Sequence, residues 1–222
     1  MGKIVVIEGT DCSGKETQAN LLIKHLTKEG YKVGKMDFPQ YNSPTGKIVG
    51  GAYLGKGEIC NSYFTEGAIN VDAKVASLYY AADRRYHLAK IKELLSENDV
   101  VILDRYTFSN MAHQGGKIHD EKERNNMYKF LEILEFELLE LPRPDKVIFL
   151  YMPFKYAEIL KKNRTDLDEH EKSKEHLINA ERTYLELSKI YGFDKVNCVN
   201  EETIKSREDI EQEVYTLVKT II

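Results

Sequence analysis

The sequence predicts an α/β fold in which helices cover both faces of a five-stranded parallel sheet. Short apolar runs alternate with longer segments of helical period, which is β-α-β-α order. Runs such as 100–103 lack polar alternation, as parallel strands buried on both faces do. The five expected strands are residues 4–7, 33–38, 100–103, 147–150 and, more weakly, 195–199. A chain of 222 residues is long enough to bury one core, so we expect a single domain over 1–222.

Helical periodicity fills the segments between these strands. The first helix contains residues 21–26, and a long helix covers 71–95. One face of the long helix is expected to be buried through the apolar residues Val75, Leu78, Tyr79, Ala82, Tyr86, Leu94 and Leu95. The glycine-rich stretch 46–57 predicts a short, mobile helix with a loop that adjusts around a ligand.

Three more helices follow in the second half of the chain. One runs from about Glu121 to Leu141, where the prolines at 142 and 144 bar its continuation. Another contains residues 177–187, and the last begins at about Arg207.

Composition and charge exclude several classes of protein. The formal net charge is −4, so the positive field that non-specific nucleic-acid binding requires is missing. No apolar run approaches the length of a membrane span, and the first residues lack a signal-peptide core. Cys12, Cys60 and Cys198 are too scattered for a disulfide framework or a CxxC metal site. We expect a cytoplasmic protein that binds neither nucleic acid nor membranes.

A glycine-rich loop follows the first strand and opens the first helix. Its sequence, Gly9 to Lys15, has the G-x-x-x-x-G-K spacing of a P-loop. Such a loop turns backbone N–H groups toward phosphates, and its lysine neutralises the transferred oxygens. The alternative, a tight turn with a surface lysine, fits the flanking strand and helix less well. The expected ATP-binding residues are Gly9, Thr10, Asp11, Cys12, Ser13, Gly14, Lys15, Glu16 and Thr17. The fold class is therefore a P-loop NTPase-like three-layer sandwich.

The residue after the P-loop lysine departs from the usual pattern. A serine or threonine there places its hydroxyl on Mg²⁺, but this chain has Glu16, followed by Thr17. Glu16 either binds the ion through its carboxylate or points away and leaves Thr17 or a water to serve. We hypothesise that Mg²⁺ binding survives in an altered geometry.

Charged residues also follow the strand at 100–103. Ligands of an open parallel sheet bind outside the carboxyl ends of its strands, so Asp104 and Arg105 are expected to face the same crevice as Lys15. A carboxylate there supports a magnesium shell, and an arginine fork grips phosphates. The alternative for Asp104 and Arg105 is a salt bridge at the strand end.

The ordered motifs of the chain resemble those of the thymidylate kinases over most of its length. The P-loop alone is unspecific, whereas the ordered set is specific. The motifs are Gly9-Thr10-Asp11 to Gln18, Phe38-Pro39, Tyr80-Ala81-Ala82-Asp83-Arg84, Asp104-Arg105-Tyr106 with Ser109 and Gln114-Gly115, and Leu141-Pro142-Arg143-Pro144-Asp145. The resemblance also implies a homodimer, for which the helix at 71–95 offers a face.

The resemblance implies roles for individual residues. Asp11 would lie by the sugar and phosphate of the acceptor nucleotide, and Arg105 would steady the phosphates between donor and acceptor. Tyr80 would stack on thymine, and Arg84 would donate a hydrogen bond to its O4. Without its neighbour Arg84, Tyr80 would instead be read as a core aromatic. The implied acceptor-binding residues are Asp11, Phe38, Pro39, Tyr41, Tyr80, Arg84, Arg105, Ser109, His113 and Gln114.

The polar stretch 163–175 is similar to the lid of these kinases. Taken alone, it reads equally well as a solvated loop. A lid excludes water while the phosphoryl group moves, and Arg164 matches a lid arginine. Some members of the family carry a further arginine in an Asp-Arg-x-Glu lid motif, but residues 168–171 of this chain contain no arginine. Other members carry that arginine in the P-loop, where this chain has Cys12.

Two other positions depart from the family pattern. Tyr41 replaces an arginine that binds the acceptor phosphate in many relatives, and His113 replaces a tyrosine next to the sugar. These changes bear on acceptor-phosphate affinity and deoxyribose selectivity, not on the reaction type. His113 is expected to be a polar pocket residue, because phosphoryl transfer needs no strong base.

The expected reaction is phosphorylation of dTMP to dTDP by in-line transfer of the γ-phosphoryl group of ATP with Mg²⁺. Lys15, Arg105 and Arg164 would offset charge, while Glu16 and Asp104 would support the metal. Three alternatives stay open: a kinase for another nucleotide or a deoxynucleoside, a GTPase-like switch, and a nucleotide-binding protein with weakened activity. The chain lacks the Asp-x-x-Gly and Asn-Lys-x-Asp motifs of the switch.

Overall fold

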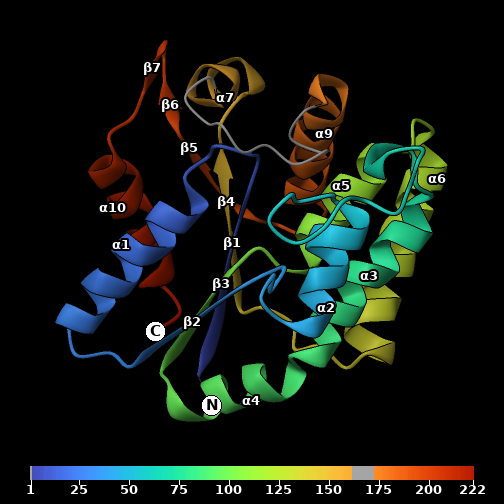
Figure 1. Ribbon diagram of the computed structural model, residues 1–222. Helices are drawn as coiled ribbons and strands as arrows, with labels where there is room; N and C mark the ends of the chain where they lie inside the picture. Colours follow the sequence, from blue (N-terminus) through green and yellow to red (C-terminus); the bar gives the residue numbers. More distant parts are fainter. Residues whose placement is uncertain (1, 162–172) are drawn as a thin grey trace.

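Strands β1 to β5 form one parallel sheet, which confirms the predicted fold class (Figure 1). The computed structural model describes residues 2–161 and 173–222. The strands are β1 (Lys3–Gly9), β2 (Val33–Asp37), β3 (Val100–Asp104), β4 (Lys146–Tyr151) and β5 (Asp194–Asn197), in the spatial order β2-β3-β1-β4-β5. All four pairings are parallel, so the carboxyl ends of the strands meet at one edge, with β1 in the centre.

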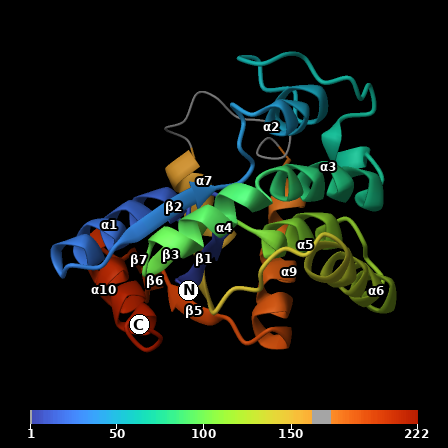
Figure 2. The same cartoon turned by 90° about the horizontal axis from the view of Figure 1, so that it is seen from below.

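Two sets of helices cover the two faces of the sheet (Figures 1 and 2). On one face, α1 (Lys15–Lys28) and α10 (Arg207–Val218) pack over Val5 and Ile7 of β1. On the other face, the helices pack over Ile4 and Val6; they are α4 (Leu88–Glu97), α5 (Thr107–Gly116), α6 (Glu121–Glu132) and α9 (Lys174–Ile190). Alternate residues of a strand point to opposite faces, which explains why residues 4–7 of β1 are all apolar.

The long helix expected over 71–95 is two helices. α3 (Ala73–Tyr86) ends at His87, whose φ of −95° and ψ of 6° break the helical path before α4 begins. The expected buried face of α3 is also wrong, because Val75, Leu78 and Tyr86 are 41%, 48% and 58% exposed and Ala82 is exposed as well.

The face that α3 does bury carries small and polar side chains: Ala76, Ser77, Ala81, Asp83 and Arg84. The polar side chains among them have hydrogen-bond or ion-pair partners there, as buried polar groups require. Apolar periodicity therefore marked the outer face of this helix.

Two helices contain wider, π-helical turns. α6 was expected to run to Leu141, but it passes at Ile133 into the π-helical turn η3 (Ile133–Leu138). The glycine-rich stretch folds into α2 (Pro44–Lys47) and a second π-helical turn, η1 (Ile48–Tyr53). α3 contacts both of these turns.

Several short elements were not anticipated. α5 is one, since its glycines at 115 and 116 weaken the helical pattern. The others are α7 (Phe154–Lys161), η2 (Ala68–Asn70) and a hairpin of β6 (Val199–Asn200) and β7 (Thr203–Ile204), which occupies the end of the weak strand expected at 195–199. Among the residues that the structure describes, no helix combines the length and apolar character of a membrane span.

The lid expected at 163–175 lies mostly outside the described residues. The described residues do not include 162–172, so Arg164 and the segment 168–171 lie outside them. Its last two residues, 174 and 175, belong to α9, which begins at Lys174 with Ser173 as its N-cap.

Candidate active site

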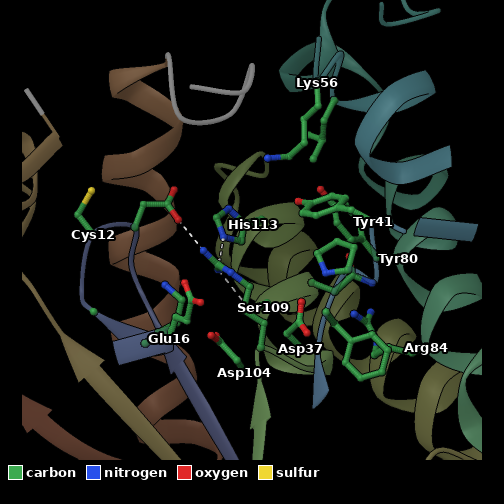
Figure 3. Close-up of a pocket in the computed structure, with 18 of the residues that line it drawn as sticks. Cys12, Glu16, Asp37, Tyr41, Lys56, Tyr80, Arg84, Asp104, Ser109 and His113 are labelled. Carbon is green, nitrogen blue, oxygen red and sulfur yellow. Dashed lines mark hydrogen bonds and ion pairs between the residues drawn. The ribbon is translucent and has the colours of Figure 1, made fainter. Parts of the chain in front are cut away.

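A cleft of about 570 Å³ opens at the carboxyl ends of β1, β2 and β3. In Figure 3, Cys12 and Glu16 lie on one side of it, and Tyr41, Tyr80 and Arg84 lie on the other. The cleft is lined by most of the residues expected from the sequence: Asp11, Cys12, Gly14, Lys15, Glu16, Thr17, Phe38, Pro39, Tyr41, Tyr80, Arg84, Asp104, Arg105, Ser109, His113 and Gln114. Gly9, Thr10 and Ser13 are buried in the loop beneath it.

The turn from β1 into α1 has the backbone shape of a phosphate cradle. Gly14 precedes α1 at a φ of 80°, and Cys12 adopts a φ of 61°, so the chain enters the left-handed region twice. A Cβ atom on Gly9 would lie 2.5 Å from Ser13 Oγ and 2.8 Å from the backbone oxygen of Leu150. Glycine is therefore required at position 9 by space and at position 14 by conformation.

Lys15 is buried in this cradle and folds back over the loop. Its Nζ donates hydrogen bonds to the backbone oxygens of Gly9 (3.1 Å) and Thr10 (2.9 Å). Burial lowers the pKa of Lys15 to about 8, with repulsion from Arg105 adding to the effect and attraction to Asp11 opposing it. The ammonium group is thus held where phosphate oxygens would meet the helix N-terminus.

This pKa predicts that activity falls as the pH rises through about 8. The charged form of Lys15 binds phosphate, so kcat/KM for ATP, which reports the free enzyme, should fall by about tenfold per pH unit above that value. Bound phosphates favour the charged form and should move the fall in kcat to higher pH. A pH profile at constant ionic strength measures both, and a kcat/KM that stays flat to pH 9.5 would contradict this role of Lys15.

Arg105 lies between the two sides of the cleft. It adopts a φ of 66° directly after β3, and its Nη2 donates to Asp11 Oδ1 at 2.6 Å. Its Nη1 is 3.5 Å from both Ser109 Oγ and His113 Nε2. Burial raises the pKa of the Asp11 carboxyl, but the charges of Arg105 and Lys15 outweigh burial and hold the pKa below its ordinary value. Asp11 is therefore a carboxylate that fixes the guanidinium.

Glu8 supports Arg105 from below, a role that the sequence analysis missed. It is fully buried and accepts hydrogen bonds from the backbone N–H groups of Tyr106 (2.9 Å) and Ser109 (3.0 Å). It also accepts from Ser109 Oγ (2.5 Å) and Tyr184 OH (2.9 Å). Burial raises the pKa of Glu8, and these donors oppose the rise. The carboxyl group caps the start of α5 and so holds the turn that carries Arg105.

Two histidines connect the cleft with α9. His113 Nδ1 lies 3.1 Å from His176 Nε2, and the rings stack with centroids 5.3 Å apart. Arg105 can only donate, so His113 Nε2 is the acceptor in their contact and Nδ1 carries the proton. Burial, and the charge of His176 after it, lowers the pKa of His113 well below its ordinary value. His113 is thus a neutral pocket residue.

Aromatic residues form the far wall of the cleft. Tyr80 on α3 is half-buried and meets Tyr53 edge-on, with ring centroids 5.8 Å apart. Phe38 is buried beside the cleft at the end of β2. Lys56 extends over the ring of Tyr41, with its Nζ 4.6 Å from the ring centroid, and both line the cleft (Figure 3). This arrangement places a cation beside the tyrosine at position 41.

Arg84 lies at the base of the far wall in a fully buried ion pair. Its Nε and Nη2 both donate to the carboxylate of Glu135 on η3, the second at 2.6 Å. Neither side chain is more than 3% exposed. Its Nη1 has no partner among residues 2–161 and 173–222 and remains for the cleft.

Two buried amides next to Arg84 carry unpaired atoms. Asn110 Nδ2 donates to Ser77 O (3.1 Å) and Glu135 Oε1 (2.9 Å), but Asn110 Oδ1 has no partner in the described part of the chain. The same holds for both amide atoms of Gln114. Both residues line the cleft and are almost completely buried. Unpaired buried polar atoms are costly, so these atoms indicate a ligand that pairs with them.

Carboxylates stand at the strand ends near the P-loop. Asp37 and Asp104 are direct neighbours in the β2–β3 register, and Glu16 lies in the first turn of α1. No group of three or more potential metal ligands occurs among the described residues. Mg²⁺ commonly takes only one or two carboxylates and completes its shell with waters and phosphates. The residues therefore fit a magnesium ion that arrives with a nucleotide.

The sequence analysis missed five residues that line the cleft. They are Asp37, Leu54, Lys56, Asn110 and Leu160. Asp37 ends a strand as Asp104 does, and the rule that ligands bind at carboxyl ends could have found it. Asn110 lies one turn before Gln114 on α5, so helical spacing from a known site residue was a second signal.

Comparisons with known proteins agree with this geometry. The family model described as "Thymidylate kinase" matches residues 7–214. The "Probable thymidylate kinase" of Pyrococcus horikoshii is 33% identical over 98% of this chain and 96% of its own length. The protein of the same name in Methanocaldococcus jannaschii is 34% identical, again over 98% and 96%. A solved thymidylate kinase structure from Candida albicans superposes with a TM-score of 0.73 at 25% identity, covering 99% of this chain and 92% of that one.

These matches run through both sides of the cleft. The family match begins within β1, before the P-loop, and ends in α10, so it includes the residues that bring Lys15, Arg105 and Arg84 together. The expectation of an enzyme of the phosphotransferase class is confirmed. This chain belongs to the thymidylate kinase family, whose members transfer a phosphoryl group from ATP to dTMP.

Proposed function

We propose that this chain transfers the γ-phosphoryl group of ATP to the phosphate of dTMP, with Mg²⁺ carried by the nucleotide. The observation that carries the proposal is the pairing, in one cleft, of a P-loop with a set of unpaired hydrogen-bonding atoms around Arg84. The two sides of the cleft have different chemistry, and the proposal assigns each side one substrate.

ATP occupies the P-loop side. Backbone N–H groups of the loop and the Lys15 ammonium hold the donor phosphates, while Arg105 lies where donor and acceptor phosphates would meet. Phosphoryl transfer requires positioning and charge stabilisation more than proton removal. The Asp11 carboxylate keeps the Arg105 guanidinium in place, which supports this assignment.

The thymine base occupies the far side. Its edge offers a carbonyl acceptor at C4 next to a donor at N3. Arg84 Nη1 supplies the donor for that carbonyl, and Asn110 Oδ1 supplies the acceptor for the N3 proton. Tyr80 would stack on the ring, and the unpaired amide of Gln114 would meet the remaining polar atoms of the nucleotide. Shape and polarity at this wall therefore favour a pyrimidine with a C4 carbonyl.

An acceptor panel tests the proposal. Release of ADP from ATP is measured with dTMP, dUMP, dCMP, dGMP and thymidine, each with and without Mg²⁺. We expect the highest kcat/KM with dTMP and no turnover without the metal. The Candida albicans structure is described as revealing the origin of broad substrate specificity, so purine monophosphates belong in the panel. Equal activity with all acceptors would refute the assignment of dTMP, and ATP binding without any ADP release would indicate a binding protein.

We propose that Glu16 and Asp104 lie on the magnesium side of the bound nucleotide. Both line the cleft beside Lys15, and Thr17 offers a hydroxyl one residue further along α1. The Glu16→Thr variant should shift the Mg²⁺ concentration that gives half-maximal rate by about tenfold, because a neutral hydroxyl replaces a carboxylate. Glu97→Thr, at the far end of α4, is the matched control and should change nothing. An unchanged metal dependence and rate in Glu16→Thr would exclude Glu16 from the metal shell.

We propose that the segment 163–175 closes over the phosphates and that Arg164 adds positive charge there. The support is the polar sequence between two amphipathic helices together with the need to exclude water from phosphoryl transfer.

We propose that the protein is a homodimer joined through the outer face of α3. Val75, Leu78, Ala82 and Tyr86 recur at helical spacing on this face and are all exposed. Ile133 and Leu138 of η3, a turn that contacts α3, are exposed as well. An exposed apolar helix face of this kind on a folded chain indicates an interface, and one helix face on each copy suits twofold symmetry.

The Leu78→Glu variant should convert this dimer into a monomer. A charge placed in the middle of an apolar interface is desolvated without a partner, which weakens association by several kcal/mol, about 3 or more. Light scattering after size exclusion measures the mass directly. Ile190→Glu, which changes another exposed apolar residue at the end of α9, is the control and should leave the dimer intact. A dimeric Leu78→Glu variant would place the interface elsewhere.

We also propose that the protein acts in a reducing, cytoplasmic setting on small nucleotides, without nucleic acid or membrane partners. Its free cysteines, Cys12, Cys60 and Cys198, and its net charge of −4 support this setting.

A further inference from the structure

The proposed function gives no role to the buried carboxylate of Glu135. Glu135 is 0% exposed and lies in η3, where the helix widens into a π-helical turn. Such turns are rare and occur frequently at functional sites. A buried acid in this position therefore calls for a reason beyond helix formation.

Glu135 receives hydrogen bonds from three residues on two other helices. Arg84 of α3 donates through both Nε and Nη2, while Thr107 (3.1 Å) and Asn110 (2.9 Å) donate from α5. Every one of these partners donates, so the acceptor sites of the carboxylate are used and its charge is balanced by the guanidinium. A buried pair of this kind adds little net stability compared with well-packed apolar side chains.

The pair does determine which atoms remain for the cleft. Because Glu135 takes the Nε and Nη2 edge of Arg84, only Nη1 is left over. Because Glu135 and Ser77 both accept from Asn110 Nδ2, the amide cannot turn, and Asn110 Oδ1 must face away from them without a partner. One carboxylate thus decides which donor of Arg84 remains and how the amide of Asn110 is oriented.

We infer that Glu135 is the positioning residue that makes this kinase select a pyrimidine with a C4 carbonyl and an N3 proton over one with a C4 amino group. The donor of Arg84 meets a carbonyl, and Asn110 Oδ1 meets the N3 proton. Cytosine presents the opposite pattern, an amino donor at C4 and an acceptor at N3. The Arg84 donor would then face the amino donor, and Asn110 Oδ1 would face the N3 acceptor. Sites built on fixed hydrogen bonds reject such mismatches strongly. This inference rests on the proposed function, because it concerns the same acceptor.

Two variants of the full-length protein test the inference. In Glu135→Gln, the neutral amide cannot accept from all these donors, so Arg84 and Asn110 lose their fixed orientation. We expect kcat/KM for dTMP to fall by about 10-fold to 100-fold, mainly through KM, and the ratio of dTMP to dCMP activity to fall at least tenfold. Glu135→Asp keeps the charge that balances Arg84 but is too short to reach both of its nitrogens, so it should lose selectivity in a protein that still folds.

Glu132→Gln is the matched control. Glu132 ends α6 three residues earlier and also holds an arginine, Arg143, at 2.9 Å, but it does not line the cleft. The ratio of dTMP to dCMP activity in the Glu132→Gln variant should equal that of the wild type. Binding of ATP, measured by calorimetry, should be the same in all variants, because the P-loop is untouched.

The possible outcomes distinguish a failure of the proposed function from a failure of the role assigned to Glu135. A wild type that does not prefer dTMP over dCMP refutes the proposed function and the inference with it. A wild type that prefers dTMP, together with folded Glu135 variants of unchanged selectivity, refutes the role of Glu135 alone. If Glu135→Gln does not fold, Glu135→Asp decides the question in the same way.

Discussion

The Lys15→Ala variant should lose about 1,000-fold in kcat while keeping its fold. Lys15 is the P-loop cation, and its Nζ hydrogen bonds hold it over the phosphate cradle. The charge that develops on the transferred oxygens would have no ammonium group beside it in the variant, and removal of one such preorganised group costs about 3 to 4 kcal/mol in the transition state. Single-turnover measurement of ADP formation with dTMP gives the effect on the chemical step.

Stability provides the independent check on this variant. Within the described residues, Lys15 pairs only with backbone oxygens of its own loop, and burial of its charge lowers its pKa. Its removal should therefore change the free energy of unfolding by less than about 1 kcal/mol. Lys24→Ala, on the exposed side of the same helix, is the control for both measurements. A Lys15→Ala enzyme within tenfold of wild-type kcat would mean that another cation neutralises the transferred group.

The parts of the fold that periodicity describes well were predictable. The core strands are apolar on both faces, and the P-loop has a spacing that few other structures share. Periodicity could not show that the apolar stripe of α3 faces outward, because an apolar stripe has the same spacing whether it faces the core or the outside. The end of α3 at His87 was equally invisible, since neither glycine nor proline marks it.

The candidate site was predictable where short motifs carry its chemistry, as with Lys15 and Arg105. The residues that support them were not. Glu8 and Glu135 are acids in the interior, and sequence alone favours the surface for glutamate. Their partners are distant along the chain: 51 positions separate Arg84 from Glu135, and 101 separate Glu8 from Ser109. The packing of α5 against β1 brings Glu8 to Ser109, and the packing of α3 against η3 brings Arg84 to Glu135.

The Arg105→Met variant should lose about 1,000-fold in kcat, as much as the lysine variant, for a related reason. Its guanidinium lines the cleft and donates a hydrogen bond to Asp11. The group lies between the P-loop and α5. Methionine fills similar space without charge, so the phosphates of donor and acceptor would repel each other without compensation. Arg105→Lys keeps the charge but not the fork and should lose an intermediate amount, about 30-fold. Steady-state kinetics with ATP and dTMP measure both.

Arg105→Met should also change the pH profile, which a purely structural defect would not do. Burial lowers the pKa of Lys15, and repulsion from Arg105 adds to the effect. Without the arginine this pKa should rise, so the fall in kcat/KM for ATP should begin at a higher pH than the value of about 8 expected for the wild type. Arg143→Met, a surface ion-pair variant, should leave profile and rate unchanged. A rate loss in Arg105→Met with an unshifted alkaline limb would show that the two cations do not share one phosphate site, and the division of the cleft into donor and acceptor sides would then need revision.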